Sequence, residues 1–370
     1  MSGDLVLRNI GTVFEPTGYA KANRHVLLEL ANRGVSARFS PIHPESVRVK
    51  LDPSVEARLH SLAHTPLPER HIVLFHYPGI HFHKDPHQFS IGMTMFECSR
   101  LPFTWVRRCS MMDEIWVPSH FNRSTFSQSG VPLHKIQVMP YGIDPGMFCP
   151  GKPPLPIAGR RSYAFLCVCS FDGRKGLDVL LTSFFEEFAE TEDVCLILKT
   201  RASTQEEIGR QQAYIDSIAV KTSGQKRSSA ILLSTTYSWT EEELAMLYNC
   251  ANSYVLPTRG EGWNMTVMEA MASGLPVITT RWSAHLDFVN DMNGYLISVQ
   301  RFIPFQSTNK RLMWADPDKQ HLKQLMRHVY IHREEAAAKA ALGRQTVSGH
   351  YTWEACAARM HHRLLEISAR

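Results

Sequence analysis

Pro257-Thr-Arg-Gly-Glu-Gly-Trp-Asn-Met-Thr-Val-Met-Glu-Ala-Met-Ala-Ser-Gly-Leu-Pro-Val-Ile278 is the stretch that decides the fold. The apolar run Ser253–Leu256 before it predicts a buried strand, and a glycine-rich turn follows. Met265–Ala272 predicts a short helix that ends at Gly274, and residues 276–280 predict the next strand. This strand–turn–helix–strand pattern is typical of an open parallel α/β sheet, which binds ligands at the carboxyl ends of its strands.

Two carboxylates within this stretch indicate what such a ligand would be. Glu261 lies in the turn and Glu269 lies in the second turn of the expected helix. Because a helix has ~3.6 residues per turn, the two side chains are expected to share a face. Carboxylates accept hydrogen bonds from sugar hydroxyls, and amide groups at a helix start favour anions. The pattern fits a hexose on one carboxylate, a ribose on the other and a diphosphate between them. An ordinary turn before a solvated helix face is the alternative interpretation.

The amide groups expected to hold the diphosphate lie at the start of that helix. They belong to Gly262, Trp263, Asn264, Met265 and Thr266.

The composition is that of an ordinary globular protein. The 370 residues exceed what one core usually holds, so we expect two domains. The formal charge of +5 suits an anionic sugar nucleotide or anionic lipid, and no nucleic-acid-binding module is recognised. Residues 1–10 do not resemble a signal peptide, and no apolar run approaches the ~18 residues that span a membrane. The eight cysteines form no CxxC pair, and Cys167 and Cys169 fit reduced thiols. We expect a cytoplasmic protein and leave open a peripheral contact with the inner face of the membrane.

Alternating strand and helix patterns occupy both halves of the chain. A proline-rich segment, residues 150–159, reads as the linker between the halves. The predicted fold class is α/β, with two doubly wound Rossmann-like domains facing each other across a cleft. The expected boundaries are residues 1–152, 153–348 and a terminal helix at 349–370.

These motifs together resemble one family, the retaining glycosyltransferases of the glycogen-synthase and sucrose-synthase type. The members that the chain resembles most are those of glycosyltransferase family 4, also described as glycosyl transferases group 1. Their signature is E-x7-E, and their architecture is called GT-B. The resemblance covers nearly the whole chain in the expected order. It is carried by Gly18-Tyr-Ala-Lys-Ala-Asn-Arg, Met95-Phe-Glu-Cys-Ser-Arg-Leu-Pro, Glu114-Ile-Trp-Val-Pro-Ser-His-Phe-Asn-Arg, Tyr141-Gly-Ile-Asp, Arg174-Lys-Gly and Trp314-Ala-Asp-Pro-Asp, besides Glu261 and Glu269.

The resemblance implies roles for individual residues. Glu261 would hold the donor sugar and Glu269 the ribose, while Lys175, with Arg174 beside it, would contact the diphosphate. Gly18 and Tyr19, placed just before the first helix, would form the family's N-terminal glycine loop and bind the donor, because a glycine there lets a ligand phosphate approach the backbone. It also implies a terminal helix that crosses back to the first domain.

The implied reaction transfers a sugar from a nucleotide-diphosphate sugar to a carbohydrate, lipid-linked or small-molecule acceptor. The anomeric configuration is retained, because the departing phosphate helps to deprotonate the acceptor on the same face. The family's chemistry needs no bound metal and no cofactor. The sequence does not name the sugar, the base, the acceptor, the linkage formed or the oligomeric state.

The chain departs from the family pattern in several places. Many members have an arginine at the strand end, where this chain has Cys169-Ser170; Arg174 either replaces it or points to water. Many members have a histidine after the fifth strand of the first domain, where this chain has Glu97. Glu97 could bind an acceptor hydroxyl, accept a proton, or simply pair with Arg100.

Further departures concern the donor corner and a histidine-rich loop. Asn264 and His285 stand where relatives often have glycine, and are expected to tune sugar choice. The loop contains His76, His81, His83 and His87, which we interpret as bordering the acceptor cleft, because no acidic or cysteine partner has the spacing of a zinc site.

Two other functions stay open at this stage. One is a GT-B glycosyl phosphorylase, which would require orthophosphate. The other is a catalytically silent subunit that binds sugar nucleotides without turnover, which the departures at Cys169-Ser170 and Glu97 would fit.

Overall fold

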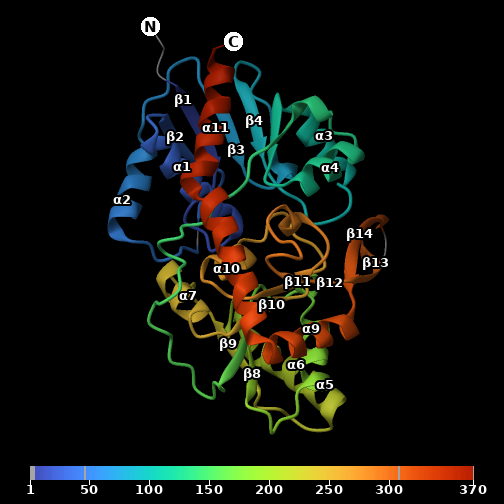
Figure 1. The fold of residues 1–370 in the computed structure, drawn as a ribbon. Coiled ribbons are helices and arrows are strands. Elements are labelled where there is room, and N and C mark those ends of the chain that lie inside the picture. Colours follow the sequence, from blue (N-terminus) through green and yellow to red (C-terminus); the bar gives the residue numbers. More distant parts are fainter. Residues whose placement is uncertain (1–4, 46, 307–308, 370) are drawn as a thin grey trace. The chain divides into compact units, whose positions relative to one another are not determined.

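The computed structural model describes residues 5–45, 47–306 and 309–369. The chain forms two compact units, Met1–Gly142 with His350–Arg370, and Ile143–Gly349. Each unit is built on its own six-stranded sheet (Figure 1). The prediction that residues 1–10 do not resemble a signal peptide falls partly on residues 1–4, which lie outside the described part.

The first unit contains a parallel sheet with the strand order β2-β1-β3-β4-β5-β6. Its strands are β1 (Val6–Gly11), β2 (Ser36–Pro41), β3 (Ile72–His76), β4 (Phe89–Met93), β5 (Glu114–Val117) and β6 (Ile136–Val138). Its helices are α1 (Gly18–Asn32), α2 (Pro53–Leu62), α3 (Phe103–Met111), α4 (His120–Ser129) and α11 (Trp353–Ser368), with the short 3-10 turns η1 (Gly79–His81) and η2 (Leu133–Lys135).

The last helix of the chain packs on the first helix within this unit. Trp353 stacks on His25 of α1 with 4.7 Å between ring centroids, and the Arg33 guanidinium donates to the Glu354 carbonyl over 2.9 Å. Farther along α11, Arg363 pairs with the buried Glu114 of β5. Figure 1 shows α11 lying alongside α1. The segments that close this unit are therefore more than 300 residues apart in the chain.

The second unit contains a parallel sheet with the strand order β12-β11-β10-β7-β8-β9 and a separate antiparallel hairpin. Its strands are β7 (Tyr163–Val168), β8 (Val194–Arg201), β9 (Ala230–Thr235), β10 (Ser253–Leu256), β11 (Val277–Thr280) and β12 (Tyr295–Ile297), and the hairpin is β13 (Val299–Gln306) with β14 (Asn309–Pro317). Its helices are α5 (Leu177–Glu187), α6 (Gln205–Ser223), α7 (Glu241–Tyr248), α8 (Met265–Ala272), α9 (Lys319–Ile331) and α10 (Arg333–His350), with the 3-10 turns η3 (Gly173–Lys175) and η4 (Ala284–Asp287).

Local side-chain caps fix where several helices begin. Thr17 accepts from the Ala20 amide at the start of α1, and Thr240 and Glu243 form a reciprocal capping box at the start of α7. Both strands and helices are lined by buried apolar residues, as covered parallel sheets require. β7 is buried at every position.

The predicted pair of Rossmann-like sheets, the GT-B fold class, is confirmed. The sequence analysis did not predict β1, β2 or the β13–β14 hairpin. Residues 150–159 contain no helix or strand and lie against the end of α7 through bonds such as Leu155 N–H to the Met246 carbonyl. The domain boundaries expected from the sequence stay a prediction.

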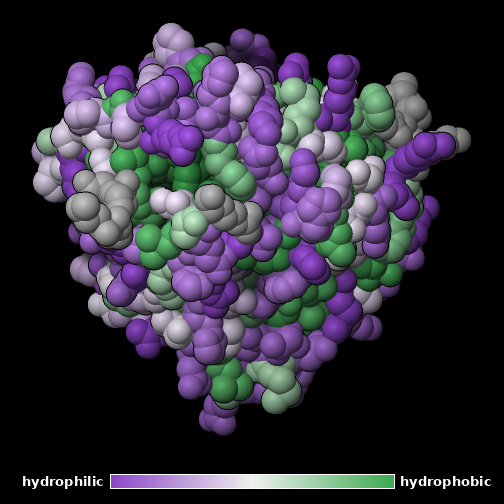
Figure 2. Space-filling view, turned by 90° about the horizontal axis from the view of Figure 1, so that it is seen from above, coloured by the Kyte–Doolittle hydropathy of each residue, from purple (hydrophilic) through white to green (hydrophobic). Residues whose placement is uncertain are grey.

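One face of the molecule is largely polar. Figure 2 shows one face on which hydrophilic residues predominate and hydrophobic ones are scattered among them. None of the helices in the described part of the chain is long and apolar enough to span a membrane.

Gly142 provides a test of the contact between α11 and the rest of the first unit. A β-carbon at this position would overlap the backbone of Thr352 and Trp353. Gly142→Ala should therefore lower the stability of this unit by about 1–3 kcal/mol, the usual cost of overpacking. Gly349→Ala is the control, because its β-carbon would meet nothing within 4 Å. Hydrogen exchange of the α1 and α11 amides should accelerate in Gly142→Ala only; equal protection in both variants would contradict the packing.

Candidate functional site

Two loops of the second unit emerge side by side at the carboxyl edge of its sheet. β10 and β7 are adjacent parallel strands, so the segments that follow them leave at the same edge. The segment after β7 contains η3, which ends in Arg174 and Lys175. The segment after β10 contains Glu261 and leads into α8. The sheet thereby joins two sequence motifs that lie 86 residues apart.

A buried carboxylate and two cations meet between these loops. Lys175 Nζ lies 2.7 Å from Glu261 Oε1, and Arg174 Nη1 lies 3.0 Å from Glu261 Oε2. Thr258 Oγ1 also donates to Glu261 Oε1 over 2.8 Å. The sequence left two positions open for the Arg174 side chain, at the site or pointing to water. In the structure it points to Glu261. Because two cations face one carboxylate, the cluster has an excess of one positive charge.

The charge state of Glu261 follows from this environment. Burial by itself would raise the pKa of its carboxyl group, since Glu261 is only 5% exposed. The nearby charges of Lys175 and Arg174, with the hydrogen bonds from Lys175 and Thr258, outweigh burial and lower the pKa to about 2. Glu261 is therefore ionised at neutral pH, and the cluster is an ion pair network.

Backbone strain is concentrated at the same corner. In the part of the chain that the structure describes, Asn264 and Ser283 are the non-glycine residues with positive φ, each at 86°. Asn264 caps α8 by accepting from the Val267 amide, and its backbone lies in the left-handed region that favours glycine. Ser283 Oγ accepts from the Glu261 amide over 3.0 Å. Such strain persists where the surroundings impose it, and it often marks functional sites.

Gly176 allows two segments to approach closely. One is the cation turn, Gly173–Lys175, and the other is the carboxylate loop, the segment after β10 that contains Glu261. The φ of Gly176 is +68°, and a β-carbon would overlap the Pro257 carbonyl oxygen. A side chain at this position would push the β7 segment away from the β10 segment. The glycine of the Lys175-Gly176 pair is thus required by close approach of the two backbones.

Glu269, the second carboxylate of the motif, is placed in α8. It is 3% exposed, and its Oε2 accepts from the Tyr248 hydroxyl over 2.8 Å. A neighbouring phenol, Tyr254, donates to Thr266 Oγ1 over 2.8 Å. The start of α8 is therefore braced by two buried tyrosines.

The predicted residues of the first unit lie at the carboxyl ends of its strands. Gly18 and Tyr19 are the first residues of α1, which corrects their expected place before the helix. The Tyr19 hydroxyl lies 3.0 Å from Thr94 Oγ1, and burial together with the charge of Glu97 raises the pKa of Tyr19. Glu97 follows β4, the fourth strand along the chain. Arg100 donates to the Gln128 carbonyl.

The four histidines do not form one loop. His76 is the last residue of β3 and is fully buried, with Nδ1 3.0 Å from Asn23 Oδ1 and Nε2 2.8 Å from the Tyr141 hydroxyl. Burial lowers its pKa to about 3, so the ring is neutral at pH 7. Across the described ranges, no group of three or more His, Cys, Asp or Glu residues is arranged to hold a metal ion.

The sequence analysis missed Thr258, Ser283 and Tyr248, each of which contacts one of the motif carboxylates or its backbone. Thr258 stands inside the quoted stretch, three positions before Glu261, and its hydroxyl was a usable signal. Ser283 and Tyr248 lie outside that stretch, and no local pattern marks them.

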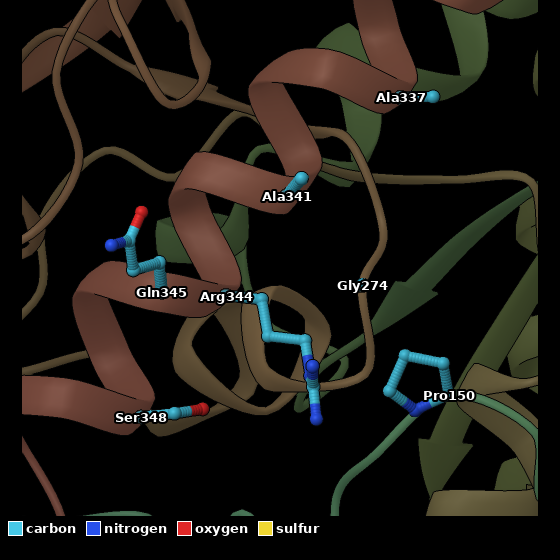
Figure 3. Close-up of a pocket in the computed structure, with 7 residues that line it drawn as sticks. All are labelled: Pro150, Gly274, Ala337, Ala341, Arg344, Gln345 and Ser348. Atoms are coloured by element: carbon cyan, nitrogen blue, oxygen red, sulfur yellow. The ribbon is translucent and has the colours of Figure 1, made fainter.

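A cavity of roughly 500 Å³ lies at the opposite end of α8 (Figure 3). It is lined by Pro150, Gly274, Ala337, Ala341, Arg344, Gln345 and Ser348. Gly274 follows the last residues of α8, whereas Asn264 and Glu261 stand at its start. None of the candidate site residues lines the cavity, so it is separate from the carboxylate–cation cluster.

Comparisons with known proteins agree with this geometry. Residues 162–305, which contain the cluster, match the family described as "Glycosyl transferases group 1". A probable sucrose-phosphate synthase of Thermosipho melanesiensis is 25% identical over 177 residues, a match that covers 44% of this chain and 37% of that protein's length.

Solved structures share the fold across the whole chain. Sucrose-phosphate synthase from Thermosynechococcus elongatus superimposes with a TM-score of 0.71 at 16% identity, covering 99% of both chains. Anabaena HepE, solved in complex with UDP and glucose, gives 0.70 at 10% identity, covering 98% of this chain and 100% of HepE. The protein described here therefore has the GT-B fold. The likeness to the glycosyl transferases group 1 family extends over residues 162–305.

The ionisation of Glu261 gives a pH-dependent prediction. Its pKa is about 2 in the folded chain against an ordinary 4.5, so the unfolded chain binds the extra proton between these values. Its contribution, on the order of 3 kcal/mol, is complete above about pH 4.5 and is lost as pH falls toward 2.

Urea unfolding from pH 7 to 3 measures this contribution. The stability difference between wild type and Glu261→Gln should shrink below about pH 4.5. Glu206→Gln, at an exposed ion pair, should show almost no difference at any pH. A Glu261→Gln difference that stays constant down to pH 3 would contradict the paired, ionised carboxylate.

Proposed function

We propose that this protein is a retaining glycosyltransferase that moves a sugar from a nucleotide-diphosphate sugar to an acceptor hydroxyl. The observation that supports this most is the cluster of Lys175 and Arg174 on the buried Glu261, at the start of α8. A site with excess positive charge beside the N-terminus of a helix suits a diphosphate. The match of residues 162–305 to the glycosyl transferases group 1 family and the HepE complex with UDP-glucose support a donor of the same class.

Lys175 and Arg174 would stabilise the leaving group. As the glycosidic bond breaks, negative charge develops on the diphosphate, and cations fixed beforehand stabilise that charge without reorganisation. Both side chains are held by Glu261 before the donor arrives, at 2.7 and 3.0 Å. The amides at the start of α8 add their dipoles on the same anion. In this proposal the protein supplies the charge itself, and the reaction needs no bound metal and no cofactor.

Glu261 has two roles in this proposal. It orients the two cations, and it has room to accept from one hydroxyl of the donor sugar, because a carboxylate has about four acceptor sites and Lys175, Arg174 and Thr258 use three of them. Glu269 would hold the ribose from the second turn of α8. Asn264 and His285 would shape the sugar pocket. The His285 ring is fully buried, and its Nε2 lies 2.6 Å from the Thr280 carbonyl oxygen.

The acceptor side is assigned to the first unit. Glu97 follows β4 at the carboxyl edge of the sheet, the edge at which such sheets bind ligands. Gly18 and Tyr19, at the start of α1, keep the donor-binding role that the resemblance implies for the glycine loop. In the proposed reaction the departing phosphate takes the acceptor proton on the same face, so the anomeric configuration is kept. The acceptor is a carbohydrate, lipid-linked or small-molecule hydroxyl, and the proposed location is the cytoplasm.

Lys175→Ala tests the diphosphate role. The variant should lose affinity for UDP, GDP or ADP, whichever binds wild type best, by about 1.5–3 kcal/mol, and lose little for the matching nucleoside. Lys319→Ala is a matched control, because Lys319 forms a 2.7 Å pair with Glu186 in the same unit. Isothermal titration measures both ligands, and equal losses for nucleotide and nucleoside would show that Lys175 does not contact phosphate.

The reaction itself is tested with a panel of nucleotide sugars and acceptors. NMR of the product should show the anomeric configuration of the donor, and turnover should survive EDTA. An inverted product would overturn the proposed mechanism. Loss of activity on chelation, restored by magnesium or manganese, would assign the leaving-group charge to a metal rather than to Lys175. Turnover that requires orthophosphate would indicate a phosphorylase, and binding without turnover a silent subunit.

A further inference from the structure

Arg259 lies within the quoted stretch but has no assigned role. It stands two positions before Glu261, is 8% exposed, and forms a bidentate pair with Asp178. Both guanidinium–carboxylate distances are 2.8 Å. The same Nη1 also donates to the Gly173 carbonyl over 2.6 Å. The side chain of the β10 segment therefore crosses to the β7 segment and holds it.

The backbone of Arg259 strengthens the same connection. Its amide donates to the Arg174 carbonyl over 2.6 Å, and its carbonyl accepts from the Ala315 amide of β14 over 3.0 Å. Nη2 also approaches Asp316 Oδ1 at 3.4 Å. One residue thus joins the cation turn, the carboxylate loop and the β13–β14 hairpin.

Arg259 contacts residues that lie before and after Lys175 in the sequence. Gly173 lies two positions before Lys175, and Asp178, in the first turn of α5, lies three positions after it. Burial alone would raise the pKa of Asp178, but the hydrogen bonds and charge of Arg259 outweigh it and hold that pKa below its ordinary value. The guanidinium of Arg259 therefore holds the turn that presents Lys175 on both sides, through the Gly173 carbonyl before it and the Asp178 carboxylate after it.

We propose that Arg259 is a positioning residue for the donor diphosphate, acting through its bidentate pair with Asp178 to fix Lys175 and Arg174 against Glu261. The inference rests on the proposed function. It goes beyond that function because Arg259 itself is not placed on the donor. Its guanidinium is engaged by Asp178, Gly173 and Asp316, so its effect on phosphate passes through the turn.

Lysine cannot reproduce this geometry. The planar guanidinium binds both carboxylate oxygens and a carbonyl in a fixed orientation, whereas an ammonium is a point charge on a flexible stem. Arg259→Lys keeps the charge and removes the fork. A small displacement of a positioned group is enough to change function about 10²-fold.

The experiment compares nucleotide affinity and stability. Isothermal titration gives the affinity of wild type and Arg259→Lys for UDP, GDP and ADP and for the three nucleosides. We expect the variant to bind the preferred diphosphate about tenfold more weakly and the nucleoside equally well. Asp178→Asn alters the other end of the pair and should give the same pattern. It replaces Arg259→Lys in the experiment if that variant folds poorly. Arg327→Lys is the control, because Arg327 holds Glu187 and Glu192 in the same unit and should leave both affinities unchanged.

A double-mutant cycle separates positioning from direct contact and from a purely structural role. If Arg259 acts through Lys175, Arg259→Lys should cost little further affinity in a Lys175→Ala background. Additive losses would overturn the inference, as would lower unfolding midpoints in Arg259→Lys and Asp178→Asn with unchanged diphosphate affinity. Wild type that binds no nucleoside diphosphate would overturn the proposed function, and this inference with it.

Discussion

The buried negative charge of Glu261 is the constraint on which the second unit's ligand edge depends. A carboxylate that is 5% exposed is stable only when it is paired and hydrogen-bonded, because its water shell has been removed. Lys175, Arg174 and Thr258 supply the partners. All three side chains must lie within hydrogen-bond distance of the same carboxylate, so the backbone that carries them has little conformational freedom.

Several otherwise unrelated features follow from this requirement. Gly176 has no side chain, and this allows the two loops to approach. Ser283 adopts a backbone conformation that favours glycine and accepts from the Glu261 amide. Arg259 ties the two loops together from the other side. The site is therefore a set of mutually dependent positions, and loss of one is expected to disturb the others more than simple addition would suggest.

The two units treat buried polar groups differently. In the first unit, the buried His76 is neutral and hydrogen-bonded to Asn23 and Tyr141, so its polar network carries no net charge. In the second unit, the corresponding edge of the sheet holds an ion cluster with excess positive charge.

The sequence by itself determined the local structure of the donor corner and the class of fold. β10 and α8 begin and end at the residues that the apolar pattern, Gly274 and the glycine turn predicted, because strand burial, helix capping and turns are governed by neighbours in the chain. It also placed Glu261 in the turn after β10 and Glu269 in the second turn of α8, where the structure has them. The contacts between distant segments were decided only by tertiary structure: Lys175 on Glu261, Tyr248 on Glu269, and α11 on α1. Each depends on which strands and helices become neighbours, such as β10 beside β7, and the order of strands in a sheet leaves no local pattern in the chain.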